Sequence, residues 1–361
     1  VGEPDWTADE LVVKSLSGEA GLPENRWYAD NGIPEFREAA AGYLKKVYGL
    51  SGIDPSENII HGIGSKPILA MLPFCFINPG DILLTTIPGY PVMATYARYL
   101  GGEVFNLPLT ESNGFLPDLD SIPDEILRKA RMLYINYPNN PTGAVATPEF
   151  FEKVVGFARK NGIVVVNDAA YGALTYDGQK PLSFLSVDGA MDVGLEVHSL
   201  SKAFNMTGWR IGFVCGNSRA IKAYGTVKDN TDSGQFRAIQ KAAVKALEHT
   251  EITEKTVEKY SRRFDLLIAA LNEAGFSAVK PKGTFFCYVK APRGTTDGKV
   301  FETAAQFSEF LIRESLISTV PWDDAGKYVR FSVTFEAATP AEEIEIINEM
   351  KKRLLAIGLV Y

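Results

Sequence analysis

The segment "VHSLSKAFNMTGWRIGF" (197–213) places one lysine, Lys202, among small hydroxyl side chains, and an arginine, Arg210, follows further along. An apolar run leads into the segment at 195–200 and another leads out of it at 209–216. Two such runs are typical of strands, so we expect Lys202 in a short turn between them. A lone lysine in a turn is usually a solvated surface residue, and this stretch alone leaves that interpretation open.

The neighbours of Lys202 favour a second interpretation. Ser199 and Ser201 flank it closely, and Thr207 and a glycine precede Arg210. Hydroxyl groups, a glycine and a fixed guanidinium are the parts of a phosphate site. A lysine beside such a site, at the end of a buried strand, predicts an amine with a lowered pKa that attacks a carbonyl. The pattern therefore favours Schiff-base chemistry with pyridoxal phosphate.

Composition narrows the classes of protein. With 361 residues, 46% of them hydrophobic, the chain can bury a large core, and its length predicts two domains. A net charge of -7 without a long basic run argues against a nucleic-acid or membrane partner. Three cysteines in apolar runs, no signal peptide and no stretch long enough to span a bilayer predict a cytoplasmic protein. The chain begins at Val1 without a methionine, so we expect some N-terminal residues to be missing.

Helix-like and strand-like segments alternate through the first two thirds of the chain. Segment 34–50 has helical apolar spacing with Pro34 at its start, and 81–89, 131–138 and 162–171 are short apolar runs closed by turn residues. Such alternation predicts an α/β fold with a mostly parallel sheet and helical crossovers.

The pattern changes near residue 250. A long amphipathic helix over 248–276 precedes two strand-like runs and a closing helix at 340–358, which predicts a smaller α+β domain. We expect a large domain at 31–250, and a small domain made of 1–30 and 251–361.

Ligands of parallel sheets bind at the carboxyl ends of the strands. Asp168 ends a very apolar strand, where an ionised carboxylate needs a cationic partner such as a pyridinium nitrogen, and Tyr171 follows three residues later. A helix N-cap aspartate followed by a core tyrosine fits this pentapeptide equally well.

Three other strand ends carry weaker signals. The turn "NYPNNPTG" presents Asn140, "GIGSKP" offers the backbone amides of Ser65 and Lys66 at a helix start, and "PGY" presents Tyr90 for stacking on a planar ring. Taken alone, the turn with Asn140 could be an ordinary loop, the segment with Ser65 could be an ordinary helix start, and Tyr90 could be a packing residue.

Together, "GSK", "PGYP", "NNPTG", "DAAY", "SLSK" and "GWR" occur in an order that resembles the class I/II aminotransferases of the fold-type I pyridoxal-phosphate superfamily, from Val1 to Tyr361. The resemblance implies a large domain with a mostly parallel central sheet and helices on both faces, plus the smaller α+β domain. It also implies pyridoxal 5'-phosphate as cofactor, amino-acid and 2-oxo-acid substrates, and no metal.

The resemblance also implies roles for individual residues. Lys202 would form the Schiff base, Asp168 would hold the pyridinium proton, and Tyr171 and Asn140 would contact the ring oxygen. Tyr28 matches a tyrosine that reaches the phosphate of the neighbouring subunit, which implies a homodimer with shared active sites. The residues implied around the phosphate are Ser65, Lys66, Ser199, Ser201 and Arg210.

On the substrate side, Arg330 matches the arginine that binds the α-carboxylate, a bidentate task suited to guanidinium, with Asn140 and the backbone of Gly2 beside it. Segments 62–73, 229–243 and 316–337 look most like LL-diaminopimelate aminotransferases, which use glutamate as amino donor in lysine biosynthesis. The residues implied at the distal end of that substrate are Asp30, Lys66 and Asn230, the last from the partner subunit.

Other functions remain open at this point. An aminotransferase of aspartate, aromatic amino acids or alanine, or a carbon-sulfur lyase on the same scaffold, would share every cofactor residue. A noncatalytic regulatory module is disfavoured because the lysine, aspartate, tyrosine and arginine are all present without a DNA-binding segment. A nicotinamide dehydrogenase is disfavoured because no glycine fingerprint follows the first strand.

Overall fold

The computed structural model describes residues 2–361. The strands are β1 (Ile59–Gly62), β2 (Ile82–Ile87), β3 (Glu103–Pro108), β4 (Ala130–Ile135), β5 (Val164–Asp168), β6 (Gly194–Ser199), β7 (Gly212–Gly216), β8 (Phe286–Lys290), β9 (Gly294–Thr295), β10 (Val320–Trp322), β11 (Tyr328–Ser332) and β12 (Leu359–Val360). The α-helices are α1 (Glu10–Ala20), α2 (Pro34–Tyr48), α3 (Ser65–Phe76), α4 (Val92–Tyr99), α5 (Asp124–Lys129), α6 (Pro148–Asn161), α7 (Ala190–Val193), α8 (Leu200–Ala203), α9 (Ser218–Asp229), α10 (Arg237–Glu248), α11 (Glu251–Glu273), α12 (Ala304–Ser315) and α13 (Pro340–Ile357).

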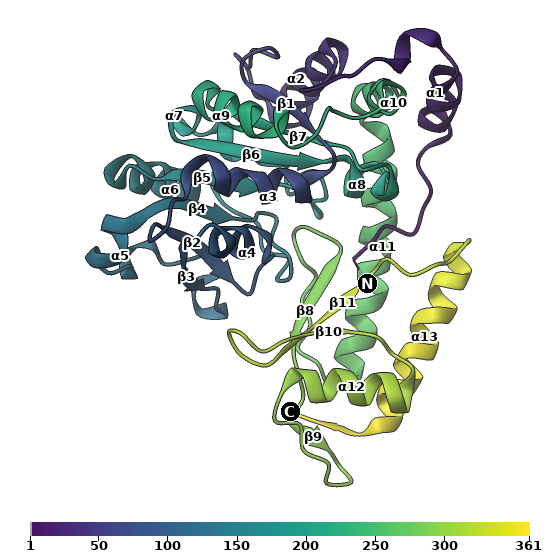
Figure 1. The fold of residues 1–361 in the computed structure, drawn as a ribbon. Coiled ribbons are helices and arrows are strands. Elements are labelled where there is room, and N and C mark those ends of the chain that lie inside the picture. Colours follow the sequence, from purple (N-terminus) through teal and green to yellow (C-terminus); the bar gives the residue numbers. More distant parts are fainter. Residues whose placement is uncertain (1) are drawn as a thin grey trace.

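A seven-stranded sheet in the order β1-β7-β6-β5-β4-β2-β3 forms the centre of the larger part (Figure 1). The strands from β6 to β3 are parallel, and only β7 runs antiparallel to its neighbours β6 and β1. The predicted mostly parallel sheet is therefore confirmed. Its inner strands are almost wholly buried, which explains why they are rich in apolar residues, whereas the edge strand β3 is largely exposed.

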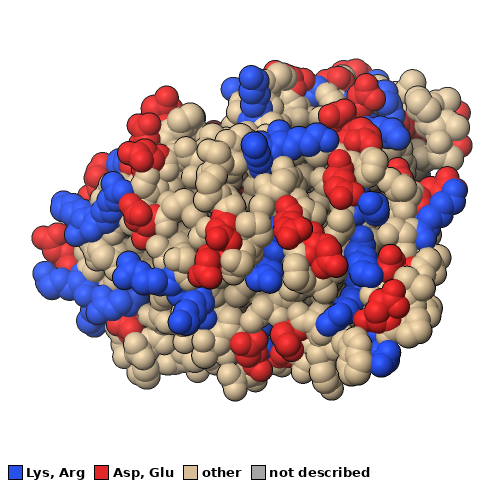
Figure 2. All heavy atoms as spheres, turned by 90° about the horizontal axis from the view of Figure 1, so that it is seen from above, with Lys and Arg blue, Asp and Glu red and all other residues tan. Residues whose placement is uncertain are grey.

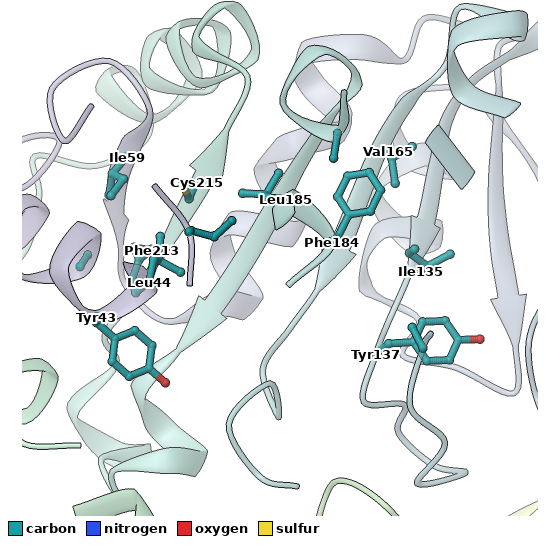
Figure 3. Packing of buried hydrophobic residues seen from close by; sticks show 14 of the residues in the cluster. Tyr43, Leu44, Ile59, Ile135, Tyr137, Val165, Phe184, Leu185, Phe213 and Cys215 are labelled. Carbon is teal, nitrogen blue, oxygen red and sulfur yellow. The ribbon is translucent and has the colours of Figure 1, made fainter. Parts of the chain in front are cut away.

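Helices cover both faces of this sheet. On one face, buried side chains of α3, α4 and α9 pack against alternate sheet residues such as Val166 and Val214. On the other face, α2, α6 and α10 pack against Val165 and Phe213; Figure 3 shows several members of this cluster. Successive residues of a strand point to opposite faces, so one strand supplies both cores.

The long helix α11 leads from α10 into the smaller part of the molecule (Figure 1). There a three-stranded antiparallel sheet, in the order β10-β11-β8, shares a hydrophobic core with α11, α12 and α13. The predicted α/β fold with a smaller α+β part is confirmed. The boundaries 31–250 and 1–30 stay a prediction, since α1 packs on α10 while Asp5 contacts α11.

Two local details differ from the sequence-based expectation. Lys202 lies in the single-turn helix α8 rather than in a turn. The strand after it begins at Gly212 instead of Trp209, because residues Thr207–Trp209 form a 3-10 turn and Arg210 has a left-handed φ of 55°.

Charged side chains of both signs are interspersed on the face shown in Figure 2. Within residues 2–361, each helix is too short or too polar to cross a membrane. The same residues contain no group of three or more His, Cys, Asp or Glu side chains arranged to hold a metal ion. The three cysteines are free thiols, and Cys215 and Cys287 are buried.

Candidate active site

A cavity of about 580 Å³ lies between the carboxyl ends of the central strands and the small antiparallel sheet. Asn136 follows β4, Asp168 ends β5 and Ser199 ends β6, while Arg330 comes from β11 and Phe286 from β8. The structure therefore brings together most of the residues singled out in the sequence. Those that line this cavity are Gly2, Ser65, Lys66, Tyr90, Asn140, Asp168, Tyr171, Ser199, Ser201, Lys202, Arg210 and Arg330.

Asp168 is a buried carboxylate with few partners. Tyr134 Oη donates to its Oδ2 at 3.1 Å, and the backbone N–H of Ala170 donates to its Oδ1 at 3.2 Å. Burial raises the pKa of Asp168 to about 6, although these hydrogen bonds and the nearby His198 and Lys202 act in the opposite direction. A cation bound beside Asp168 would favour its ionised form.

Lys202 lines the cavity and is partly buried. Its Nζ donates a hydrogen bond to the carbonyl oxygen of Gly2 at 2.6 Å. Burial lowers the pKa of Lys202 to about 8; the carboxylate of Glu3 raises it, and the cations Arg210 and Arg330 lower it. The amine is therefore uncharged at a lower pH than an ordinary lysine, as nucleophilic attack requires.

One end of the cavity has the geometry of an anion site. Helix α3 begins at Ser65, directly after Gly64, whose φ is 81°. The guanidinium of Arg210 lies so close to Gly64 that any side chain there would collide with it, and a Cβ on Gly212 would lie 3.4 Å from Ser65 N. Free backbone amides at a helix start, beside an arginine, bind phosphate well. The hydroxyl side chains in the cavity lining are Ser65, Ser199, Ser201 and Thr207.

Aromatic rings form the cavity walls. The ring of Tyr171 packs edge-on against Phe285 and Phe286, with centroid distances of 5.3 and 5.6 Å. Burial raises the pKa of Tyr171, so its phenol stays protonated and can donate a hydrogen bond. The ammonium of Lys66 lies 5.8 Å from the ring centroid of Tyr90.

Arg330 occupies the other end of the cavity. Its Nη1 donates to Asn140 Oδ1 at 2.5 Å, and its guanidinium lies 3.8 Å from the ring centroid of Phe286. Its Nε is buried and has no hydrogen-bond partner within residues 2–361. Buried donors are nearly always satisfied in proteins, so this nitrogen is available to donate a hydrogen bond to a carboxylate ligand.

Sequence reasoning missed two residues that hold the strand ends together. Asn136 Nδ2 donates to the carbonyl of Asp168 at 2.6 Å, and its Oδ1 accepts from the backbone N–H of Asn140 at 2.8 Å. Asn136 is a polar residue directly after an apolar run, and this position could have indicated it. Tyr134, which binds Asp168, lies inside such a run and gives no signal of its own.

Three residues singled out in the sequence lie outside this cavity. Tyr28 is 76% exposed, and with Asp30 it lines a separate hollow beside Arg237. The Asp30 carbonyl accepts a hydrogen bond from Lys228 Nζ at 2.6 Å, and Asn230 directly follows α9, two residues after Lys228. In a single chain these residues do not meet Lys202.

The fold and the cavity define an enzyme of the aminotransferase class. Residues 12–349 match the model of the family "Aminotransferase class I and II", and the chain belongs to this family. It is 56% identical to the LL-diaminopimelate aminotransferase of Methanocaldococcus jannaschii, over 100% of this chain and 88% of that protein. It is 53% identical to the enzyme of the same name from Methanococcus maripaludis, with the same coverage.

A solved structure supports the same assignment. The structure of apo-BacF from Bacillus subtilis superposes with a TM-score of 0.92 at 36% identity, covering 99% of this chain and 94% of that one. The predicted family, fold class and aminotransferase activity are therefore confirmed.

Proposed function

We propose that the cavity binds pyridoxal 5'-phosphate. The anion site at the start of α3 suits the phosphate. The buried carboxylate of Asp168 suits the ring nitrogen, since none of residues 2–361 places a cation in direct contact with it. When bound, this cofactor supplies an electron-withdrawing ring that makes the Cα proton of an amino acid acidic. The residues that would hold it are Ser65, Lys66, Tyr90, Asn140, Asp168, Tyr171, Ser199, Ser201, Lys202 and Arg210.

The chain's own side chains then divide the work of amino transfer. Arg330 binds the substrate α-carboxylate through its free Nε and a terminal nitrogen, with Asn140 fixing the guanidinium. Lys202 Nζ accepts the proton from the substrate Cα as general base and returns it as general acid. Asp168 stays ionised and balances positive charge at the far end of the ring.

The amino acid we assign is LL-diaminopimelate, with 2-oxoglutarate as the amino acceptor, as in lysine biosynthesis. The observation that carries this assignment is the 56% identity, over the whole chain, to a relative of that name. A substrate with an amino-acid centre at each end needs polar groups beyond Arg330. Lys66 is in the cavity, whereas Asp30 and Asn230 would have to be supplied by a partner subunit.

The assignment is tested by mixing the holoenzyme with 2-oxoglutarate and single amino acids, and following glutamate formation. We expect LL-diaminopimelate to react fastest, with the meso isomer as a matched control that differs at one centre. Preference for aspartate, alanine or aromatic amino acids would overturn the substrate assignment and keep the reaction class. Release of sulfide or ammonia without glutamate would instead favour the lyase.

We also propose a homodimer with shared active sites, in the cytoplasm, where free thiols such as Cys75 are typical. Large aromatic side chains are exposed on the single chain, among them Trp27 at 58%, Tyr28 at 76% and Tyr99 at 75%. Aromatic side chains are enriched in protein interfaces, and Trp27 and Tyr28 are adjacent in the chain. The separate hollow beside Tyr28 would then face the partner's cavity.

Mixed dimers test the sharing. Inactive Lys202→Ala subunits mixed with Tyr28→Ala subunits should regain activity, because one site of each mixed dimer has a normal Lys202 and receives a normal Tyr28. Random mixing should restore about a quarter of the wild-type sites in a twofold dimer. Lys202→Ala mixed with Arg330→Ala should restore none, since both residues line one cavity of one chain. Recovery in the second mixture, or a fully active monomer, would contradict the arrangement.

The lowered pKa of Lys202 predicts how cofactor uptake depends on pH. Only the neutral amine can bond to the cofactor aldehyde, so the rate of reconstitution of the apoenzyme should rise with pH, with its midpoint at about pH 8, and level off at higher pH. An ordinary lysine would give a midpoint at pH ~10.4. Stopped-flow absorbance measures the rate. Glu3→Gln removes a carboxylate that raises this pKa and should move the midpoint to lower pH; an upward move would contradict the assignment.

A further inference from the structure

The N-terminal segment Gly2–Trp6 connects the cavity to α11, and we call this segment the strap. At its cavity end, the carbonyl of Gly2 accepts the hydrogen bond from Lys202 Nζ, and a Cβ on Gly2 would lie 3.8 Å from Arg330 Nη2. Figure 1 shows the N-terminus beside α11 and β11. The strap therefore forms a wall of the cavity next to the α-carboxylate site.

Asp5 fixes the other end of the strap in a buried ionic contact. Its Oδ1 lies 2.9 Å from Lys259 Nζ, its Oδ2 lies 3.0 Å from Arg263 Nη1, and its side chain is only 2% exposed. Tyr260 Oη donates to the same carboxylate at 3.3 Å, and the Lys259 ammonium lies 3.7 Å from the ring centroid of Trp6. Buried carboxylates with several charged partners hold their position tightly.

The same arginine also holds the strand that carries Arg330. Arg263 Nη1 donates to the carbonyls of Val333 at 2.9 Å and Phe335 at 2.7 Å, and these residues follow β11 directly. Arg263 Nε donates to Glu343 Oε1 of α13 at 2.8 Å. One buried guanidinium thus connects the strap, the end of β11 and α13.

We propose that Asp5 is a positioning residue for amino-acid binding: through Arg263 and Lys259 it holds Gly2 beside Arg330 and so shapes the α-carboxylate site. This inference rests on the proposed function of Arg330. It assigns no contact between Asp5 and the substrate, and Asp5 does not line the cavity. The anion site of Ser65 and Arg210 and the carboxylate of Asp168 belong to other elements, so they should hold the cofactor without Asp5 even though Gly2 contacts Lys202.

Asp5→Asn tests the proposal, because the amide keeps the shape and removes the charge. Its KM should rise about tenfold for both glutamate and LL-diaminopimelate, the order expected for a disturbed hydrogen bond to a charged group, while the affinity for pyridoxal phosphate stays unchanged. Asp5→Glu should recover part of the loss. The control is Asp265→Asn on the same helix α11, whose partner is Lys280 at 2.8 Å and which does not touch the strap; its KM values should stay at the wild-type level.

The possible results distinguish a failure of the proposed function from a failure of the role proposed for Asp5. A wild type that transfers no amino group from any amino acid contradicts the proposed function, and with it this inference. An active wild type with unchanged KM in Asp5→Asn, or with equal losses in cofactor affinity, overturns the inference alone. If Asp5→Asn does not fold, Lys259→Met is the substitute test, because it removes one of the two cations that contact Asp5. A raised KM in Lys259→Met supports the proposal, and an unchanged KM overturns it.

Discussion

Replacing Lys202 with alanine should lower amino transfer by ~10³-fold or more, since the variant lacks both the nucleophile and the group that moves the Cα proton. Pyridoxal phosphate should still bind, because the anion site of Ser65 and Arg210 and the carboxylate of Asp168 do not depend on the lysine. Multiple-turnover assays measure the first effect, and cofactor absorbance after gel filtration measures the second.

Two controls sharpen this result. Lys280→Ala removes a lysine paired with Asp177 and Asp265 outside the cavity, and it should retain wild-type activity. Lys202→Arg keeps a positive charge but offers no nucleophile, and it should be as inactive as the alanine variant. A Lys202→Ala enzyme with a tenth of the normal rate would show that another group carries out the proton transfer.

Asp168→Asn should have the second largest effect, a loss of ~10²-fold or more in kcat. The amide fills the same space and can still accept from Tyr134, but it carries no charge to pair with a protonated ring nitrogen in this buried place. The measurement is kcat at saturating cofactor, so that weaker binding does not contribute.

Asp192→Asn is the matched control for this variant, since it removes an exposed carboxylate paired with Arg159 at 2.7 Å. Exposed pairs of this type contribute little, so its kcat and stability should stay close to wild type. Near-normal turnover in Asp168→Asn would show that the ring is held by a different group.

The fold could be predicted because the central strands are buried on both faces. Each of β2, β4 and β5 is rich in apolar residues and is followed by turn residues, and α2 carries its proline at the first turn. The start of β7 could not be read in this way. Trp209 and Ile211 continue the apolar pattern, but the left-handed backbone of Arg210 delays the strand.

The cavity residues that lie at the carboxyl ends of strands could be predicted from the sequence. Asp168 and Ser199 stand at such ends, and parallel strands bring their carboxyl ends to one edge. Asp5 and Glu3 gave no comparable signal, because the partners of Asp5 are on α11, more than 250 residues away in the chain. Tertiary contacts of that separation leave no periodic pattern in either segment.

Residues assigned from the family resemblance are a different case. Tyr28, Asp30 and Asn230 have no local pattern that indicates a function, and in the single chain they lie apart from the cavity. Their roles depend on the second subunit, and so they stay predictions that the mixed-dimer experiment addresses.

The most direct test of the role of Lys202 is to identify the residue to which the cofactor is bonded. Borohydride reduces a carbon–nitrogen double bond to a stable linkage, so treating the holoenzyme and mapping its peptides identifies the lysine that holds pyridoxal phosphate. We expect a single labelled peptide, and it should contain Lys202. A label on Lys66, the other lysine in the cavity lining, or no label at all would contradict this expectation.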